Sequence, residues 1–333
     1  MGYIVAVNHL SEPYIREYCG NLAKVLEGSV DIYHADKKYT LDESSKYIFV
    51  AVIPHNLTLL SNDEKQRLTL INIDQLTTKY RTIRFDHIKY VQNTGIRVLH
   101  YTADHGLNPD TNLIKSEMSD KPEKSENSEE SIVNDNLFPR NMKLSQQIQV
   151  IPCLIDKDET CYLRELISNT EIKYDVAFCG LLIGRRLELF NNLKSAGLSV
   201  IDATAWGLVR DTKIASARIL LNIHVYEEYK MYECIRCDRW LAAGKLVVTE
   251  NCLEESYNSS RPMLIIANYN KLIETIVNIL KCYSLCQEQL NRYLANNLDA
   301  IIDNRIQECQ RYFPSQIIST ESEPETIKSS FTH

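Results

Sequence analysis

Residues 221–250 read LNIHVYEEYKMYECIRCDRWLAAGKLVVTE. The apolar run Arg218–Ile223 predicts a buried strand, the next segment predicts a helix over Glu228–Ala243, and Lys245–Thr249 predicts a second buried strand. Gly244 marks the end of the helix, because glycine is common just after the last helical residue. A strand, a helix and a strand in this order indicate a parallel α/β sheet.

Three polar residues stand at the ends of these elements. His224 follows the first strand, Glu233 lies early in the expected helix, and Glu250 ends the second strand. Ligands of parallel sheets bind where strands end and helices begin, so all three are expected on that side. Each also has a structural interpretation: a rim histidine, a helix-surface partner of Arg236, and a capping or surface acid.

The composition excludes several classes of protein. At 333 residues, with 44% hydrophobic and 24% charged residues, the chain is expected to form two soluble domains. A formal net charge of -7 argues against nucleic acid as a partner. No apolar run approaches the roughly 18 residues of a transmembrane helix, and the N-terminus predicts a strand rather than a signal peptide. We therefore expect a cytoplasmic protein, in the host cytoplasm if the abundance of Ile, Asn and Tyr reflects a viral source.

The cysteine and glycine content limits the kinds of binding site that the chain can form. Ten cysteines without a secretion signal predict free thiols, and Cys234 and Cys237 form a CxxC that falls inside the expected helix. Only ten glycines occur, and neither GxGxxG nor GxxxxGK[ST] is present. Any bound phosphate must therefore be held by side chains and helix ends.

The chain alternates between strand and helix patterns on both sides of a polar insertion at residues 115–135, which is too poor in apolar residues to pack. We predict a Rossmann-like first domain over 1–147, a second over 148–312, and a polar tail over 313–333. The expected strands are Tyr3–Asn8, Val30–His34, Lys46–Ile53, Thr69–Ile73, Gly95–Tyr101, Ile148–Leu154, Tyr174–Cys179, Leu198–Asp202, Arg218–Ile223, Lys245–Thr249 and Met263–Ala267. The other expected helices are Glu12–Leu26, Arg185–Ala196, Tyr269–Leu280 and Gln287–Gln310.

A basic turn, CGLLIGRR, connects a strand to a helix in the second domain. Gly180 and Gly184 permit close approach of a ligand, and Arg185 and Arg186 fall in the first helical turn. Positive side chains there oppose the helix dipole, which predicts an anion such as a diphosphate at this helix end. The alternatives are a solvated arginine pair or a salt bridge to Glu188.

Two further groups of residues are weaker candidates. In the first domain, His9 follows the first strand, and Asp104 and His105 follow the last one, where they could orient or deprotonate an acceptor hydroxyl. Loop polarity alone is the simpler explanation of these residues. Asp156 and Asp158 match the DxD of metal-dependent nucleotide-sugar enzymes, but such a triplet is common by chance and lies in the expected connection between domains.

The run from residue 174 to 250 resembles the C-terminal half of GT-B glycosyltransferases. The matching motifs are F-x-G-x4-R-R, W-G, L-N-I-H, E-x-x-R and L-A-x-G-x-x-V-V-x-E. The similarity is strongest to group 4-like enzymes of the spore-maturation (CgeB/YkvP-like) branch and to proteins of large DNA viruses. It covers residues 172–255, and it extends to the first domain only through the architecture.

The resemblance implies two Rossmann-like domains facing a central cleft, with a last helix that crosses back onto the first domain. It implies transfer of a sugar from a UDP- or GDP-sugar to a glycan or small-molecule acceptor, without a metal or other cofactor and with retention of configuration. The residues that it places around the donor are Gly180, Gly184, Arg185, Arg186, His224, Lys230, Glu233 and Glu250.

The sequence departs from the family in two places. Where relatives with a full E-x7-E motif have a first acid, this chain has Val225, and its helix carries ECIRCDRWLAAG instead of E-x-x-A-C-G. Two alternatives therefore remain open: a non-catalytic nucleotide- or sugar-binding module on the same fold, and a sugar-nucleotide epimerase.

Overall fold

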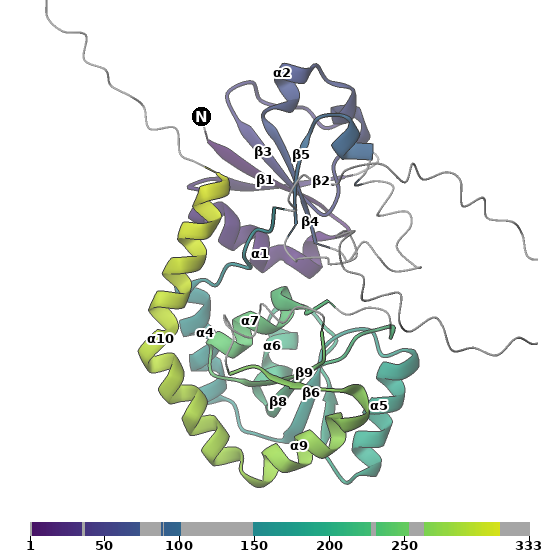
Figure 1. The fold of residues 1–333 in the computed structure, drawn as a ribbon, viewed down its shortest axis with the longest axis vertical. Helices are drawn as coiled ribbons and strands as arrows, with labels where there is room; N and C mark the ends of the chain where they lie inside the picture. Colours follow the sequence, from purple (N-terminus) through teal and green to yellow (C-terminus); the bar gives the residue numbers. More distant parts are fainter. Residues whose placement is uncertain are drawn as a thin grey trace, which may run out of the picture.

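The computed structural model describes residues 2–34, 37–73, 88, 90–100, 149–227, 231–252 and 263–313. These residues form two lobes, each built around a five-stranded sheet with helices packed against it (Figure 1). Neighbouring strands pair in parallel throughout both sheets. The predicted α/β class with two parallel sheets is confirmed.

The first sheet contains β1 (Tyr3–Asn8), β2 (Ser29–Tyr33), β3 (Lys46–Val50), β4 (Leu68–Asn72) and β5 (Arg97–His100). The second contains β6 (Tyr174–Phe178), β7 (Val200–Asp202), β8 (Ala217–Asn222), β9 (Leu246–Glu250) and β10 (Ile265–Ala267). The helices are α1 (Glu12–Val25), α2 (Asn62–Lys65), α4 (Lys157–Asn169), α5 (Gly184–Ser195), α6 (Gly207–Ala215), α7 (Cys234–Ala242), α9 (Leu272–Lys281) and α10 (Tyr283–Tyr312), with short 3-10 turns η1 (His55–Leu59) and η5 (Tyr269–Lys271).

Both sheets have the same winding. Their strand orders are β2-β1-β3-β4-β5 and β10-β9-β8-β6-β7, so in each lobe the first strand lies between the second and the third. The direction of winding changes between β1 and β3 in the first lobe and between β6 and β8 in the second. Ligands of doubly wound sheets bind beside the carboxyl ends of the strands at such a switch point.

The central strands of the second sheet are buried because helices cover both faces. All five residues of β9 are buried, as are the last four of β8. One hydrophobic core runs through this sheet and on to α1 of the first lobe. The lobes therefore share packed side chains as well as polar contacts.

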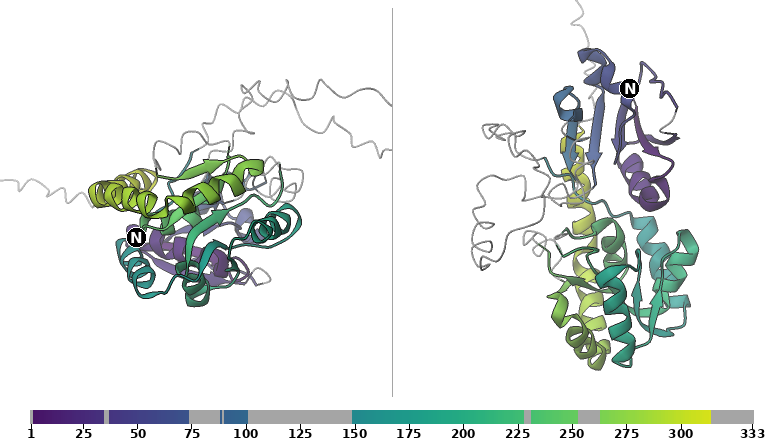
Figure 2. Two further views of the ribbon diagram at one scale, coloured as in Figure 1. Left: turned by 90° about the horizontal axis from the view of Figure 1, so that it is seen from below. Right: turned by 90° about the vertical axis from the view of Figure 1, so that its right-hand side faces the viewer.

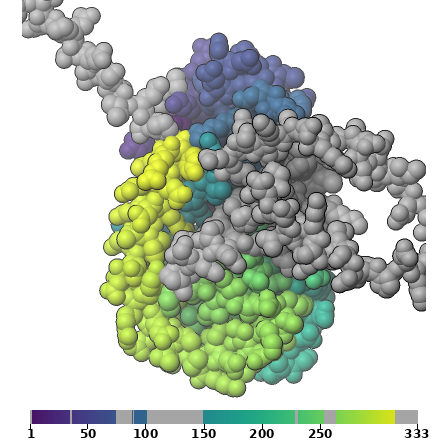
Figure 3. All heavy atoms as spheres, in the orientation of Figure 1, coloured from purple at the N-terminus to yellow at the C-terminus, as the bar shows by residue number. Residues whose placement is uncertain are grey.

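The last helix joins the two lobes. α10 runs along the second lobe and ends on the first (Figures 1 and 2), and in the space-filling view it forms a continuous ridge along one side (Figure 3). At its end, Arg97 of β5 donates to the carbonyl of Tyr312 at 2.6 Å. Phe313 packs edge-on against Tyr3 of β1 at 5.8 Å. A helix that crosses back in this way is what the resemblance implied.

Two sequence predictions of secondary structure are wrong. In the described part of the expected strand Ile148–Leu154, only Val150 forms a bridge, to His100 of the first sheet, and the chain then crosses to the second lobe. The helix expected over Glu228–Ala243 begins only at Cys234. Met231 and Tyr232 are buried before the helix starts, so their apolar character was misread as helical periodicity.

Two helices of the second lobe were not predicted. α4 occupies the expected connection between the domains, and Asp156 caps it by accepting the amide of Glu159 at 2.9 Å. α6 starts directly after Trp206 without a side-chain cap. α4 was missed because its sequence is rich in charged residues, and α6 was missed because no capping residue marks its start.

Other sequence predictions have mixed outcomes. All ten cysteines are free thiols, as predicted, and Cys234 and Cys237 are buried in α7. No helix among the described residues has both the length and the apolar character needed to cross a bilayer. The insertion at 115–135 lies outside the described residues, as does the tail beyond Phe313.

Lys245 makes stability depend on pH. This lysine is 2% exposed, and its Nζ donates to the carbonyls of Ala215 and Ala217 at 3.1 and 2.5 Å. Burial lowers its pKa from 10.5 to about 8. Since the unfolded chain then binds more protons than the folded chain above pH 8, this residue makes the free energy of unfolding rise with pH until the unfolded lysine titrates near 10.5.

We therefore expect wild type to gain about 2 kcal/mol relative to Lys245→Met between pH 7.5 and pH 9.5. Urea unfolding of both proteins at each pH measures this difference. The comparison cancels the buried cysteines, such as Cys19, whose raised pKa acts in the opposite direction. Replacement of the exposed Lys281 by methionine should leave the pH dependence unchanged, and parallel curves for wild type and Lys245→Met would contradict the prediction.

Candidate functional site

The candidate site lies at the switch point of the second sheet, where β6 and β8 end. Gly180, two residues after β6, has a φ of 147°, in the region that favours glycine. A Cβ at this position would lie 3.4 Å from Nη1 of Arg186 and 3.5 Å from Nη2 of Arg236. Two guanidinium groups from different helices therefore converge on a residue that has no side chain.

Arg186 is held in place by its surroundings. It belongs to the first turn of α5, is 5% exposed, and donates from Nε to the carbonyl of Ile223 at 2.8 Å. Its guanidinium also stands over the ring of Phe178, with 5.5 Å to the centroid. Burial and these contacts fix a positive charge beside the end of β8.

Arg236 comes from the first turn of α7. Its Nη1 donates to Oδ1 of Asn222 at 3.2 Å, and its Nη2 lies 3.8 Å from a carboxylate oxygen of Glu233. Glu233 is the N-cap residue of α7, not an early helical residue as predicted, and its side chain is 22% exposed. The structure thus contains the Glu233–Arg236 pair that was the structural interpretation of this acid.

Arg185 faces a different partner. Its two terminal nitrogens donate to both carboxylate oxygens of Glu250, at 2.6 and 2.7 Å. The guanidinium stacks on Tyr269, with 3.9 Å to the ring centroid, and the Tyr269 hydroxyl donates to the Arg185 carbonyl at 2.7 Å. The arginine is therefore neither solvated nor paired with Glu188. Its bidentate contact with Glu250 uses two of the N–H donors that a phosphate would otherwise bind.

Glu250 connects three elements. It ends β9 and is 2% exposed, so the interpretation as a surface acid is wrong. Besides the arginine of α5, its Oε2 accepts the amide of His224 at 3.1 Å. The ring of His224 is buried, and its Nε2 lies 3.0 Å from the carbonyl of Asn251. A carbonyl only accepts, so Nε2 carries the proton, and His224 is a buried residue rather than one on the rim.

The loop after β7 closes the other side of the site. The Thr204 hydroxyl donates to the carbonyl of Gly180 at 2.6 Å and accepts its amide at 3.1 Å. This double contact fixes the backbone at the point where the arginines meet. Gly184 has a φ of 49° and starts α5, which accounts for the second glycine of the turn.

Three arginines and two carboxylates have been placed around this part of the second lobe. Arg185 pairs with Glu250, whereas Arg186 and Arg236 both approach Gly180. A group with two or more negative charges fits this arrangement, because guanidinium groups bind phosphate oxygens through paired N–H donors.

The structure adds four residues that the sequence did not single out as site residues: Asn222, Thr204, Arg236 and Tyr269. A signal was present for the first, which is a polar residue at the end of an apolar strand, and for Arg236, which entered only as a partner of Glu233. Nothing in the sequence pointed to Thr204 or Tyr269.

The first-lobe candidates are only partly described. His9 follows β1, its amide donates to the Tyr33 carbonyl at 2.8 Å, and its ring packs on His34 with centroids 4.1 Å apart. Its Nδ1 is buried and has no hydrogen-bond partner within the described ranges of the chain. Asp104 and His105 lie outside the described residues, as does Lys230 of the second lobe.

The DxD residues are engaged elsewhere. Lys24 of α1 contacts Asp156 at 2.6 Å and Asp158 at 2.5 Å. The first of these acids is also the N-cap of α4. Both carboxylates therefore take part in a contact between the lobes, as expected if their match to the DxD pattern arose by chance.

Comparison with known proteins identifies relatives but no function. No protein-family model matches the chain. One uncharacterized protein of Acanthamoeba polyphaga mimivirus is 35% identical over 147 residues, 42% of this chain and 17% of that protein. A second is 25% identical over 285 residues, 83% of this chain and 33% of that protein. A third is 26% identical over 286 residues, 83% of this chain and 79% of that protein.

The chain thus matches about a sixth and a third of the length of two of these relatives. Their similarity agrees with the viral source that the composition suggested. Their names assign no activity.

Proposed function

We propose that this chain is a GT-B glycosyltransferase that binds the diphosphate of a nucleotide sugar beside Gly180. The observation that carries the proposal is the convergence of Arg186 and Arg236 on this residue at the switch point of the second sheet. A diphosphate would meet two guanidinium groups there, beside a glycine and next to the ring of Phe178, whose Cζ would lie 3.3 Å from a Cβ at this position.

The architecture supports the same proposal. Two parallel sheets of equal strand order, joined by a final helix that returns to the first lobe, are the arrangement expected of GT-B enzymes. The fold alone does not determine an activity, since similar folds host unrelated functions. The proposal therefore rests on the arginines.

The proposed chemistry follows from the charges. When the sugar leaves its donor, negative charge develops on the departing diphosphate, and Arg186 and Arg236 stabilise it. They would take the part that a metal plays in other enzymes, so transfer is proposed to need no metal. Glu233, at the start of α7, would accept hydrogen bonds from the ribose hydroxyls.

The acceptor is proposed to bind to the first lobe. His9 stands at the carboxyl end of β1, next to the switch point of that sheet, where its imidazole could orient or deprotonate an acceptor hydroxyl. Retention of configuration is proposed by analogy with the family that the sequence resembles.

Calorimetry with nucleotides tests the donor site. We expect wild type to bind UDP or GDP more tightly than the 2′-deoxy form of the same nucleotide, and Glu233→Ala to lose about 1 kcal/mol of this preference. Replacement of Glu227, an exposed acid in the same connection, should keep the preference. Equal preferences in wild type and Glu233→Ala would remove Glu233 from the site.

One observation favours a non-catalytic binding module. Val225 occupies the position of the first acid of the E-x7-E motif, so one group that relatives contribute is missing. A transfer and hydrolysis assay over several nucleotide sugars separates the two functions. Binding without turnover would support the module, and an altered nucleotide sugar formed without any acceptor would indicate an epimerase.

A further inference from the structure

One face of α1 points toward the second lobe. Glu17, Asn21 and Lys24 recur at intervals of four and three residues, which places them on the same side of the helix, and Tyr14 lies just before the kink at Ile15. Each contacts the second lobe: Tyr14 packs on Trp206 at 4.5 Å, Asn21 donates to Glu159 at 3.2 Å, and Lys24 pairs with the two aspartates described above. This face is mostly polar.

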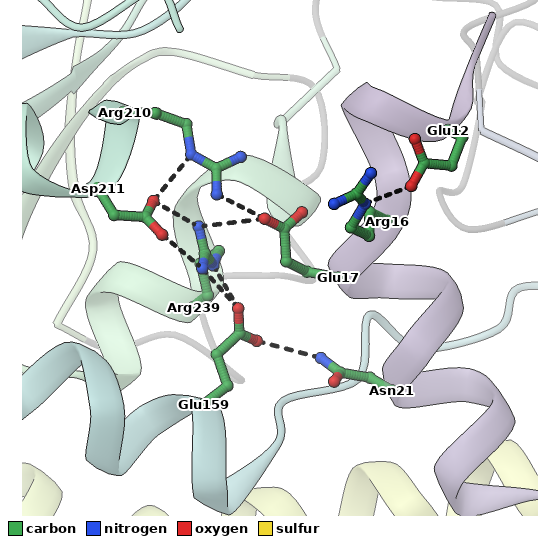
Figure 4. A network of polar contacts seen from close by, with 8 residues as sticks. All are labelled: Glu12, Arg16, Glu17, Asn21, Glu159, Arg210, Asp211 and Arg239. Atoms are coloured by element: carbon green, nitrogen blue, oxygen red, sulfur yellow. Dashed lines mark hydrogen bonds and ion pairs between the residues drawn. The ribbon is translucent and has the colours of Figure 1, made fainter. Parts of the chain in front are cut away.

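At the centre of the face lies a cluster of five charged residues, here called the interlobe cluster (Figure 4). Its members are Glu17 of α1, Glu159 of α4, Arg210 and Asp211 of α6, and Arg239 of α7. Glu17 accepts from Nη2 of Arg210 at 2.6 Å and lies 4.0 Å from Nη1 of Arg239. Its side chain is 25% exposed, and those of the two arginines are 10% exposed.

The second lobe already satisfies its own charges in this cluster. Arg239 donates to Glu159 at 2.7 Å and to Asp211 at 3.0 Å, and Arg210 donates to Asp211 at 2.8 Å. These four groups are two cations and two anions. The carboxylate of Glu17 is therefore a surplus charge contributed by the other lobe.

A surplus carboxylate that is largely removed from water is costly unless its partners are close. Burial raises the pKa of Glu17, but the charges of Arg210 and Arg239 and the hydrogen bonds to the carboxylate together outweigh it, so the net pKa lies below the ordinary value. The contact thus stabilises one arrangement of the lobes, in which Glu17 faces both arginines.

Two chains of contacts lead from α1 to the candidate site. The first passes from Glu17 to Arg239, which lies three residues after Arg236 on α7. The second passes from Tyr14 to Trp206, two residues after Thr204, whose hydroxyl holds Gly180. Both end at the place where the guanidinium groups converge.

We propose that Glu17 is a positioning residue that ties α1 of the first lobe to α7 and so sets the position of Arg236 and Glu233. This positioning role rests on the proposed function in one respect: it takes a nucleotide to be the ligand that binds at α7. When the two lobes are in contact, the interlobe cluster holds the N-terminal end of α7, which carries Glu233 and Arg236, in place. When the lobes move apart, α7 loses this support and the anion site loosens.

Glu17→Gln tests the proposal, because it removes the charge and keeps the shape. In the full chain without nucleotide, we expect the amides of α7 to exchange about three- to tenfold faster with deuterium. We expect the Kd for UDP or GDP to rise between about twofold and thirtyfold. Glu165→Gln, which removes an exposed acid on α4, should change neither quantity.

The unfolding midpoint separates positioning from simple destabilisation. Without the Glu17 charge, the two arginines and two carboxylates of the second lobe still pair with one another, so we expect the urea midpoint of Glu17→Gln to stay near that of wild type while the nucleotide Kd rises. A lowered midpoint with an unchanged Kd would overturn the proposal, because Glu17 would then contribute to stability alone.

The two proposals fail differently. If wild type binds neither UDP nor GDP, the proposed function fails, and the exchange of α7 alone decides whether Glu17 positions that helix. If wild type binds a nucleotide and Glu17→Gln changes neither its Kd nor the exchange of α7, the positioning role is refuted while the proposed function stands.

Discussion

Glu250→Gln is expected to lower the free energy of unfolding by about 3 kcal/mol, because it breaks a buried ion pair and leaves one partner behind. The Arg185 side chain is 16% exposed and that of Glu250 3%, so water cannot replace the lost carboxylate fully. The amide of His224 also loses its charged acceptor. Urea denaturation at neutral pH measures the change.

An exposed pair provides the matched control. Glu274 contacts Lys271 at 2.8 Å, but the two side chains are 63% and 62% exposed. Glu274→Gln should therefore lower the free energy of unfolding much less than Glu250→Gln does. Equal losses for both variants would show that Glu250 contributes no more than a surface acid.

Arg236→Met is expected to reduce the rate of sugar transfer by about a hundredfold, if the chain acts on nucleotide sugars as proposed. The change removes one of two guanidinium groups beside the departing diphosphate and keeps most of the side-chain volume. Turnover assayed by nucleotide release with UDP- and GDP-sugars measures it. Arg292→Met, at a 69% exposed position on α10, should leave the rate unchanged.

Binding measurements define what Arg236 contacts. We expect its loss to weaken the binding of the nucleoside diphosphate while hardly changing that of the nucleoside. A uniform loss for both ligands would contradict a contact with the diphosphate and would indicate a general disturbance of α7.

The sequence predicted those elements whose signal is local. The apolar runs that became β8 and β9, with Gly244 before the second, have the expected order and nearly the expected bounds. The start of α7 was misplaced because Met231 and Tyr232, which lie before the helix, are buried as helical residues of a core-facing side would be. Periodicity does not distinguish these two cases.

In the candidate site, too, local features were predicted and contacts between distant residues were not. The turn with Gly180 and Arg186 was found from its residues, because its glycines and basic side chains are adjacent in sequence. The pairing of Arg185 with Glu250 joins residues 65 positions apart, and no local pattern reports it. Arg236 was seen only as a surface partner of Glu233, since its approach to Gly180 depends on how two helices are placed.

The path of α10 has a consequence for the order in which the chain is completed. Arg97 meets the carbonyl of Tyr312 across 215 residues, and Tyr3 meets Phe313 across nearly the whole described chain. A ribosome makes the first lobe long before it makes these partners. Tyr3 of the first strand and Arg97 of the fifth therefore gain their contacts with the end of α10 only after translation has passed residue 313.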